Sequence, residues 1–567
     1  MASLQKYSVK GHEYYRIVES RRINGKSRPI PILHIGTRED LIQRLVNPSQ
    51  GPMSIRSFQH GDVACLKAIA DKLDVIGIID RHVGKRRRAV SVGTSLLLAA
   101  INRASKPVSK RAWIDWAKGT SIEKFFHVQL SQLTSQHFWD QMDEVSESAL
   151  EAIEGEITAR IIKEFNIGLD TIFYDTTNFF TYIASSNMRS TLTARGKNKQ
   201  KRSDLRQFGL GLLVSRDGEV PLASNVYKGN IHDSKIFPES LTRIRQRLER
   251  MAVTLEDLTL VYDKGNNSKK NQALVDEEKF HYVGSLVPTQ YQDLLSIPKA
   301  EYKPLGEGKL KDVPVYRLKK LIWGVERTLV LFISDRLLRG QIAGLQQHLN
   351  KCLSELEEWK KILAKPGSGP HTAESAKKQI DELLSAQHMK EVLKIEYNHR
   401  PKGSNRLSWK VDQEKVHHLT TEVFGKRILM TDRHDWSSEE IIVAYRGQSK
   451  VESNFKQGKD PDHLAVRPQY HWTDQKVRVH TFICLLALML SRLLEREARQ
   501  HGYKHCLSTL LDELATIKLA LIMTAGTSKK SPLDCKWQLE EADEDTMSLL
   551  LKLVPHRQPF VYTATNG

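Results

Sequence analysis

The amino-acid sequence predicts a multi-domain α+β protein, and three observations support this class. The chain has 567 residues, too many for one compact core, and roughly three to four domains of about 150 residues are expected. Apolar, β-branched runs lead into Asp175 and Asp263. A long helical pattern then separates Asp263 from Glu452. We therefore expect a mixed sheet flanked by helices, interrupted by an insertion of strands and a helical hairpin, between helical N-terminal and C-terminal regions.

The composition indicates a partner that is a polyanion. The chain carries 86 Lys and Arg against 67 Asp and Glu, a formal net charge of +19. Its five cysteines are scattered and form no C-x-x-C pair, so neither a disulfide framework nor a zinc knuckle is indicated. The apolar run from Phe482 to Leu490 is shorter than the about 20 residues of a membrane span. A cytoplasmic protein with no membrane partner is expected.

The N-terminal part divides into two predicted regions. Residues 1–40 read as a basic β-hairpin around an Asn24-Gly25 turn. Residues 41–165 have helical apolar spacing and form a predicted DNA-binding region, with the cationic run of Lys85, Arg86, Arg87 and Arg88. Trp113 and Trp116 fit a DNA-contacting surface and a packed core equally well.

Residues 166–290 form the first part of the predicted core. A strand carrying Asp175 precedes an exposed basic stretch, and a hairpin follows that turns at Asp217-Gly218. A helix starting at Asp233-Ser234 leads to the strand that ends at Asp263. Three antiparallel strands, a helix and a parallel strand match the order of an RNase H-like core.

Residues 291–430 form the predicted insertion. Two strand-like runs precede a seam of apolar residues with gaps of 4 and 3, the spacing of a heptad repeat: Leu338, Ile342, Leu345, Leu349, Cys352, Leu356, Trp359 and Leu363. The seam stops at residues 366–370, and helical spacing resumes over 373–395. We expect a helical hairpin over 335–395, with an intermolecular coiled coil as the alternative. Strands are expected over 407–411 and 421–430.

Residues 431–475 form the second part of the core. Ser437-Ser438-Glu439-Glu440 predicts a helix start, and Tyr445, Gln448, Glu452 and Lys459 share one face if that helix continues past Gly447. Residues 476–567 form the C-terminal helical region, with helices over 474–499 and 507–523 and a possible role in dimerisation.

Asp175, Asp263 and Glu452 together predict a two-metal phosphoryl-transfer site. Carboxylate oxygens suit Mg²⁺, with Mn²⁺ as an expected substitute, and two such ions stabilise the attacking and leaving oxygens of a phosphodiester. Asp175 would bridge the ions, while Asp263 and Glu452 would each hold one. Lys459, with Arg446 or Lys456, would neutralise the DNA backbone.

The chain resembles bacterial insertion-sequence transposases of the DDE type that carry a Tyr-x2-Arg-x3-Glu-x6-Lys signature. Tyr445, Glu452 and Lys459 match that signature, and the blocks YDTTNFF, VYDKG and AYRGQSKVESNFKQGK are similar to those of the family. Gln448 stands where the family has Arg, and Arg446 lies two residues earlier.

The resemblance implies a cut-and-paste DNA transposase that acts as a homodimer on terminal inverted repeats and on target DNA through hairpin ends. It implies a bacterial cytoplasmic location at the nucleoid and a base-stacking aromatic in the insertion, for which Trp323 is the candidate against a reading as a core strand residue. The expected DNA-binding residues are Tyr445, Arg446, Gln448, Lys456, Lys459, Arg195, Lys197, Lys199, Lys201, Arg202, Lys85, Arg86, Arg87 and Arg88. The acids alone equally allow a nuclease without strand joining. The basic composition also allows a transposon-derived DNA-binding protein.

Overall fold

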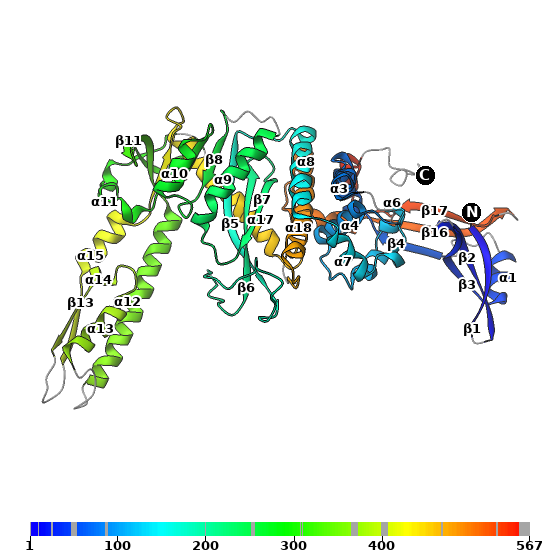
Figure 1. The fold of residues 1–567 in the computed structure, drawn as a ribbon, viewed down its shortest axis with the longest axis horizontal. Coiled ribbons are helices and arrows are strands. Elements are labelled where there is room, and N and C mark those ends of the chain that lie inside the picture. Colours follow the sequence, from blue (N-terminus) through cyan, green and yellow to red (C-terminus); the bar gives the residue numbers. More distant parts are fainter. Residues whose placement is uncertain are drawn as a thin grey trace. The chain divides into compact units, whose positions relative to one another are not determined.

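The protein is described from a computed structural model (Figure 1). The structure describes residues 2–9, 11–23, 26–46, 54–84, 89–198, 200–250, 256–306, 308, 310–363, 372–398, 406–466, 469–528 and 531–554. The chain separates into two compact units. Unit 1 comprises Met1–Leu258 and Ser449–Gly567, and unit 2 comprises Thr259–Gln448. Each unit is described by itself.

The N-terminus of unit 1 is a three-stranded antiparallel sheet rather than a lone hairpin. Strands β1 (Ala2–Val9), β2 (His12–Ile23) and β3 (Lys26–Gly36) pair in that order, and helix α1 (Arg38–Val46) follows. The predicted pairing of β2 with β3 is confirmed, and its last residue pair is Ile23 with Lys26. The predicted turn residues Asn24 and Gly25 lie outside the described residues. Ile17 and Leu33 of this sheet pack against Leu521 and Met523.

A group of helices follows, as the apolar spacing predicted. They are α2 (Gly61–Lys72), α3 (Val75–Val83), α4 (Val92–Ser105), α5 (Trp113–Lys118), α6 (Ile122–Phe126), the 3-10 helix η1 (Leu130–Gln132), α7 (Ser135–Asp143) and α8 (Glu147–Phe165). Trp113 is only 2% exposed and packs on Trp116 and Phe138, with ring centroids 5.8 and 5.0 Å away. Trp113 is therefore a core residue.

The C-terminal region mixes helices with strands, and the prediction of a helix over 507–523 is wrong in its second half. Helix α18 (Asp474–Gln500) is followed by α19 (Leu507–Thr516), which ends at Thr516. Strands β16 (Lys518–Ser528) and β17 (Ser531–Leu539) then precede α20 (Glu544–Leu553). Strand β16 lies between β17 and β4 (Ser54–Gln59), which comes from the far end of the sequence. The backbone N–H and C=O groups of β16 form hydrogen bonds with two partner strands, one of them from a distant part of the sequence. The local spacing of apolar residues does not predict such pairing.

Helix α18 is the main core helix of unit 1. By length and composition this helix could span a membrane, because an 18-residue stretch of it has a mean hydropathy of 1.7. However, 94% of that stretch is buried inside the protein. It packs against α2, α4, α7 and α8. The helix therefore has the packing of a buried core element.

Three antiparallel strands carry the first predicted acid. Strands β5 (Thr171–Thr181), β6 (Arg206–Ser215) and β7 (Pro221–Lys228) pair in order, and α9 (Asp233–Arg250) follows, as predicted (Figure 1). Gly209 and Gly211 make room on β6 for two tyrosine rings, since a Cβ would lie 2.1 Å from the Tyr227 ring and 2.9 Å from the Tyr174 hydroxyl. Phe237 of α9 packs edge-on against Tyr174, so α9 covers this face.

The strands of unit 2 that pair in a mixed sheet follow the order β10 (Lys303–Pro304), β11 (Pro314–Ile322), β12 (Val325–Ile333), β15 (Lys426–Thr431), β9 (His281–Ser285) and β8 (Thr259–Tyr262). Among these described strands of unit 2, β8 and β9 pair in parallel and the other neighbours pair antiparallel. Strands β11, β12 and β15 come from the predicted insertion, yet they extend the sheet that contains β8. The connecting elements are α10 (Lys269–Asp276), η2 (Pro288–Gln290), α11 (Gln292–Leu295), η3 (Lys299–Glu301) and α16 (Ser438–Arg446).

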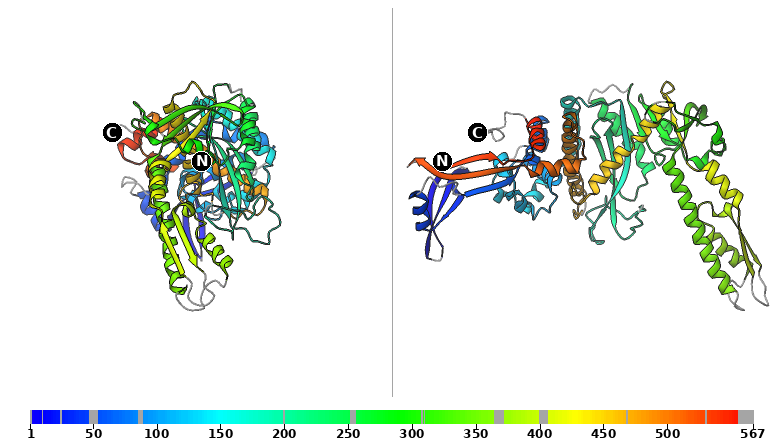
Figure 2. Two further views of the ribbon diagram at one scale, coloured as in Figure 1. Left: turned by 90° about the vertical axis from the view of Figure 1, so that its left-hand side faces the viewer. Right: turned by 180° about the vertical axis from the view of Figure 1, so that it is seen from behind.

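The predicted seam is confirmed, but its partner differs from the prediction. All eight seam residues of α12 (Asp335–Leu363) belong to one apolar cluster. That cluster is closed by α13 (Ala373–Leu383), α14 (Met389–Val392), α15 (Gln413–His418), the π-helix η4 (Leu419–Val423) and the hairpin of β13 (Leu393–Asn398) and β14 (Arg406–Val411) (Figure 1, Figure 2). Trp359 stacks on Tyr397 at 5.8 Å. Residues 393–395 are thus strand, and residues 366–370 lie outside the described part.

Candidate active site

Asp175 lies in the middle of strand β5 rather than at its end, which corrects the prediction. The strand continues to Thr181 because Phe179 and Phe180 are buried and the backbone stays paired with β6 as far as Arg206. Residues 175–178 are half-buried between two fully buried stretches. Because side chains alternate along a strand, Asp175 points to the face opposite Tyr174 and shares its face with Thr177 and Phe179.

Helix α17 (Ser449–Lys459) packs on that same face of β5 (Figure 1). Lys459 Nζ donates to Thr177 Oγ1 at 2.6 Å and lies 5.5 Å from the centre of the Phe179 ring. Glu452 is exposed in the first turn of α17, seven residues before Lys459 and therefore on the same side of the helix. In unit 1, Asp175 thus lies on one face of β5, and Glu452 and Lys459 lie on α17, the helix that packs on this face.

The orientation of α17 is fixed by a buried arginine of α18. Arg492 is 3% exposed, and its guanidinium donates to Asn454 Oδ1 and Ser453 Oγ, both at 2.8 Å. The same guanidinium pairs with Glu495 at 2.7 Å. Asn454 in turn donates to the backbone oxygen of Glu219 at 2.8 Å, in the turn between β6 and β7. These contacts clamp the helix that carries Glu452.

Asp263 follows strand β8 in unit 2 and is half-buried beside the buried Tyr445 of α16. The Tyr445 hydroxyl donates to Asp263 Oδ1 at 2.9 Å and accepts from Arg427 at 3.3 Å. Burial, followed by the negative charge of Asp263, raises the pKa of Tyr445 to about 12. The phenol therefore stays protonated and orients the Asp263 carboxylate.

The predicted single helix face from Tyr445 to Lys459 is broken. Helix α16 begins with the predicted capping box of Ser437 and Glu440 but ends at Arg446, with Gly447 as its C-cap, and α17 begins at Ser449. Gln448 lies between the two helices and is 8% exposed, whereas Arg446 and Lys456 are exposed. Gln448 is uncharged and buried, so of Gln448 and Arg446 only Arg446 offers an exposed positive charge.

No group of three or more His, Cys, Asp or Glu side chains able to hold a metal ion gathers among the residues that the structure describes. Asp175 and Glu452 belong to unit 1, and Asp263 belongs to unit 2. The donors themselves suit a hard divalent cation, since all are carboxylates. Asp175 and Asp263 are each half-buried.

The predicted basic residues after β5 are exposed. Arg195, Lys197, Lys201 and Arg202 all stand in solvent, and Arg202 pairs with Asp204 through two hydrogen bonds of 2.8 and 2.7 Å. Lys199, Lys85, Arg86, Arg87 and Arg88 lie outside the described residues.

Trp323 is not a core residue of a strand, contrary to the reading that the sequence favoured. It occupies the two-residue turn between β11 and β12, half-buried, with Ile322 paired to Val325. Its φ is +54° and that of Gly324 is +89°, the left-handed region that the favoured hairpin turns require. A left-handed conformation costs a non-glycine residue about 1–2 kcal/mol. The side chain thus stands at a strained hairpin tip.

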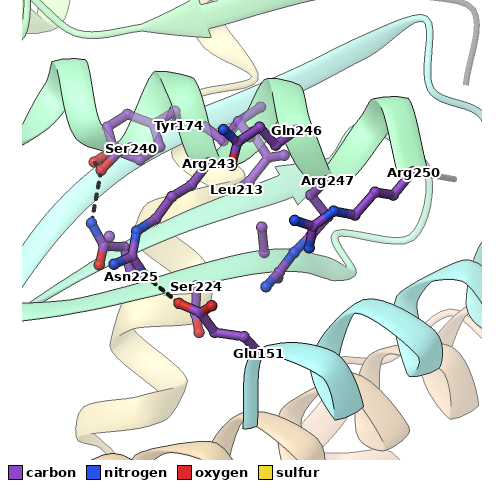
Figure 3. Close-up of a pocket in the computed structure, with 13 residues that line it drawn as sticks. Glu151, Tyr174, Leu213, Ser224, Asn225, Ser240, Arg243, Gln246, Arg247 and Arg250 are labelled. Atoms are coloured by element: carbon purple, nitrogen blue, oxygen red, sulfur yellow. Dashed lines mark hydrogen bonds and ion pairs between the residues drawn. The ribbon is translucent and has the colours of Figure 1, made fainter. Parts of the chain in front are cut away.

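A separate cavity lies on the other face of the unit 1 strands (Figure 3). Tyr174, Asn225 and Ser240 line it, and Ser240 accepts hydrogen bonds from both others. Arg243 and Arg247 at its rim pair with Glu151 at 3.0 Å and Glu154 at 2.7 Å (Figure 3 draws the first pair). Because Tyr174 and Asp175 point to opposite faces, this cavity is distinct from the Asp175 surface.

Sequence reasoning missed the side chains that position the acids. Arg492 stood in an apolar helical run, where a lone arginine is a signal of a buried partner. Glu219 has a φ of +55° in the turn after β6, a backbone strain that the sequence does not reveal. Arg427 had no signal beyond its place in a strand.

Three comparisons bear on the identity of the chain. A search of the solved structures found a match to the piggyBac transposase in a synaptic complex with hairpin DNA, at 8% identity, a TM-score of 0.39 and coverage of 82% of each chain. A search of the curated proteins found no match. The family model described as "Transposase DDE domain" matches residues 185–490, more than half of the chain, a span that begins after Asp175 and contains Asp263 and Glu452. The chain therefore belongs to the transposase DDE domain family.

Proposed function

We propose that this protein is a DNA transposase that cuts DNA at the ends of a mobile element and joins those ends to target DNA. The single observation that carries the proposal is the hydrogen bond from Tyr445 to Asp263. It connects the tyrosine of the transposase signature with a candidate catalytic acid, and both residues lie inside the family match. Membership of the family supports the reaction class.

Asp175, Asp263 and Glu452 are the residues that would hold two Mg²⁺ ions. Such ions stabilise the charge that develops on the attacking and leaving oxygens of a phosphodiester. Tyr445 keeps the Asp263 carboxylate in one orientation. Lys459, Arg446 and Lys456 would bind backbone phosphates, with Arg446 in the role of the signature arginine that Gln448 replaces.

The remaining features of the proposal follow from the family resemblance. The core would be RNase H-like, and the protein would act as a homodimer on terminal inverted repeats in the bacterial cytoplasm. Cleavage would proceed through hairpin ends, with Trp323 stacking on a displaced base. The position of Trp323 at the tip of a hairpin supports this role better than a strand interior would.

Substitution of the acids tests the reaction. Purified Asp175→Ala, Asp263→Ala and Glu452→Ala variants should bind a DNA fragment carrying the terminal repeats as the unsubstituted protein does, and should show at least about 1,000-fold slower cleavage in Mg²⁺. Asp115→Ala is the control, because this acid is exposed on α5 and its ion pair among the described residues is with the neighbouring Lys118 at 3.3 Å. Full strand transfer by any acid variant would overturn the assignment.

Two other functions make different predictions in the same assay. A nuclease of this fold would cleave the terminal repeats without joining the ends to a target plasmid, so plasmid integration separates it from a transposase. A transposon-derived DNA-binding protein would bind the repeats and show no Mg²⁺-dependent cleavage. The retained acids and the Tyr445–Asp263 bond favour the transposase.

A further inference from the structure

Three aromatic side chains in unit 1 are unusually exposed. Among the described residues, the exposed large hydrophobic side chains include only three aromatic ones, which are Tyr182 (46%), Tyr470 (62%) and Trp472 (56%). We call these three residues the aromatic patch. Tyr182 directly follows β5, and the other two lie just before α18. The Tyr182 amide donates to the Gln469 carbonyl at 2.9 Å, and the rings of Tyr182 and Tyr470 lie 5.7 Å apart.

The segment that carries two of these rings is firmly anchored. Exposure alternates along it, since Gln469 and His471 are 0% and 5% exposed while Tyr470 and Trp472 face solvent. The His471 ring stacks on the His480 ring of α18 at 4.4 Å, and its Nε2 lies 2.9 Å from Lys110 Nζ. Because the backbone is already fixed, a ligand that stacks on the exposed rings loses little binding energy to ordering them.

The segment after β5 is fixed to the same place. Asn187 Nδ2 donates to the Trp472 carbonyl at 3.2 Å, and Arg206 donates to the Asn187 carbonyl at 2.9 Å. The Asp474 carboxylate at the start of α18 accepts hydrogen bonds from Ser190, Thr191 and the Leu192 amide at 2.7 to 3.2 Å. Two segments far apart in the sequence thus form one surface.

The chain segment that follows Tyr182 is strongly basic in sequence. Residues 183–206 contain seven basic residues, Arg189, Arg195, Lys197, Lys199, Lys201, Arg202 and Arg206, and a single acid, Asp204. The hydrogen bonds from Arg202 lower the pKa of Asp204 to about 2, so this acid is a neutralised partner of one arginine. An exposed apolar surface with a cationic border fits a ligand with flat apolar faces and negative charges.

We propose that the aromatic patch stacks unpaired bases of single-stranded DNA while the exposed Arg195, Lys197 and Lys201 bind its phosphates. This inference rests on the proposed function, in which cutting the element from its surroundings exposes bases. A duplex hides the faces of its bases, so the patch would select unpaired over paired DNA. Stacking on an aromatic side chain is worth about 1–3 kcal/mol per base, or roughly 5- to 150-fold in affinity.

Binding of the full-length protein to fluorescent oligonucleotides, measured by anisotropy in EDTA, tests the proposal. A single-stranded oligothymidylate, an abasic strand of the same length and a blunt duplex are the three probes. The Tyr470→Ala/Trp472→Ala variant should bind oligothymidylate at least about 25-fold more weakly and the blunt duplex unchanged. The unsubstituted protein should bind the abasic strand as weakly as this variant does, because that strand keeps its phosphates and lacks bases.

Two control variants make the result specific. Tyr470→Phe/Trp472→Phe keeps aromatic rings and should retain at least half of the single-strand affinity, whereas Ile55→Ala removes a comparably exposed apolar side chain (54%) from β4 and should have no effect. Equal binding of oligothymidylate and the abasic strand by the unsubstituted protein would overturn the proposal, as would unchanged binding by the double alanine variant. Asp175→Ala should bind oligothymidylate normally, so loss of cleavage and loss of stacking are separate outcomes.

Discussion

The Tyr445 side chain both packs in the core of unit 2 and donates a hydrogen bond to a candidate catalytic acid. Its hydroxyl donates to Asp263 and accepts from Arg427, while its ring lies in the core of unit 2. Burial and the charge of Asp263 raise its pKa to about 12, so the phenol is protonated and can donate its hydrogen bond at neutral pH. A carboxylate that accepts such a bond keeps its second oxygen available for a cation.

The Tyr445→Phe variant should retain the fold and lose orientation of Asp263. A hydrogen bond to a charged group is worth about 1.5–3 kcal/mol, so DNA cleavage should slow by roughly 10- to 100-fold. Tyr503→Phe is the matched control, because its hydroxyl donates to Glu513 at 2.7 Å on α19, outside the candidate site. Single-turnover cleavage rates measure the effect, and equal rates for Tyr445→Phe and the unsubstituted protein would remove Tyr445 from the site.

Lys110 gives unit 1 a pH-dependent stability. Burial, followed by the nearby Arg103 charge, lowers the pKa of Lys110 to about 7, well below its ordinary value of 10.5. Between these values the unfolded chain holds a proton that the folded chain lacks, so the free energy of unfolding rises as pH increases from about 7 to about 10. The expected slope is at most about 1.4 kcal/mol per pH unit.

Urea denaturation at pH 7.5, 8.5 and 9.5 checks this prediction. Lys110→Met should remove most of the rise in stability over this range, because methionine does not titrate. The exposed Lys106→Met variant serves as the control and should keep the full rise. A Lys110→Met protein with the same pH dependence as the unsubstituted protein would show that Lys110 is charged in the folded state.

At the scale of elements, the position of Glu452 depends on how α17 is packed against its neighbours. Helix α17 contacts β5 through Lys459 and is clamped by Arg492 of α18. Arg492→Met should therefore destabilise unit 1 by about 3 kcal/mol, since Glu495 loses its buried partner. Cleavage should fall as well, because α17 carries Glu452.

Arg499→Met is the matched control for this substitution. Arg499 also pairs with Glu495, at 2.6 Å, but is 52% exposed, and exposed pairs are worth about 0–1 kcal/mol. Urea denaturation should thus separate the two variants clearly. Equal stability for both would show that the Arg492 contacts do not hold α17.

The sequence predicted most elements because their patterns are local. The β6–β7 hairpin, the capping box at Ser437 and the apolar seam of α12 each depend on residues within a few turns of one another. Partners from distant sequence could not be predicted. The sequence of β16 has helical spacing, but in the structure it pairs with β4 and β17. The sequence of β5 indicates a strand end at Asp175, but pairing with β6 continues to Thr181.

The same limit applies to the candidate site. The three acids and Tyr445 remain predictions from the sequence, which rest on strand-like runs before the aspartates and on the spacing of the signature that the chain resembles. The break at Gly447 and the contacts of Arg492 and Arg427 depend on tertiary packing, and helical spacing alone does not contain that information.

At the scale of the whole molecule, the net charge of +19 should govern DNA affinity. Each phosphate contact releases counterions, so the logarithm of the binding constant should fall linearly with the logarithm of salt concentration. The Arg195→Ala/Lys197→Ala variant should lower that slope by about 2, because both residues are exposed in the basic segment after β5. Anisotropy titrations from 50 to 300 mM KCl provide the measurement, and an unchanged slope would exclude both residues from phosphate binding.

The burial of α18 has a consequence for how the protein is made. Its packing partners α2, α4, α7 and α8 leave the ribosome first, but α18 itself follows only after all of unit 2 has been synthesised. Until then the early helices lack the helix that completes their core, and contacts so distant in sequence form slowly. A chain in which α18 has been synthesised but has not docked therefore exposes a helix that is long and apolar enough to span a membrane.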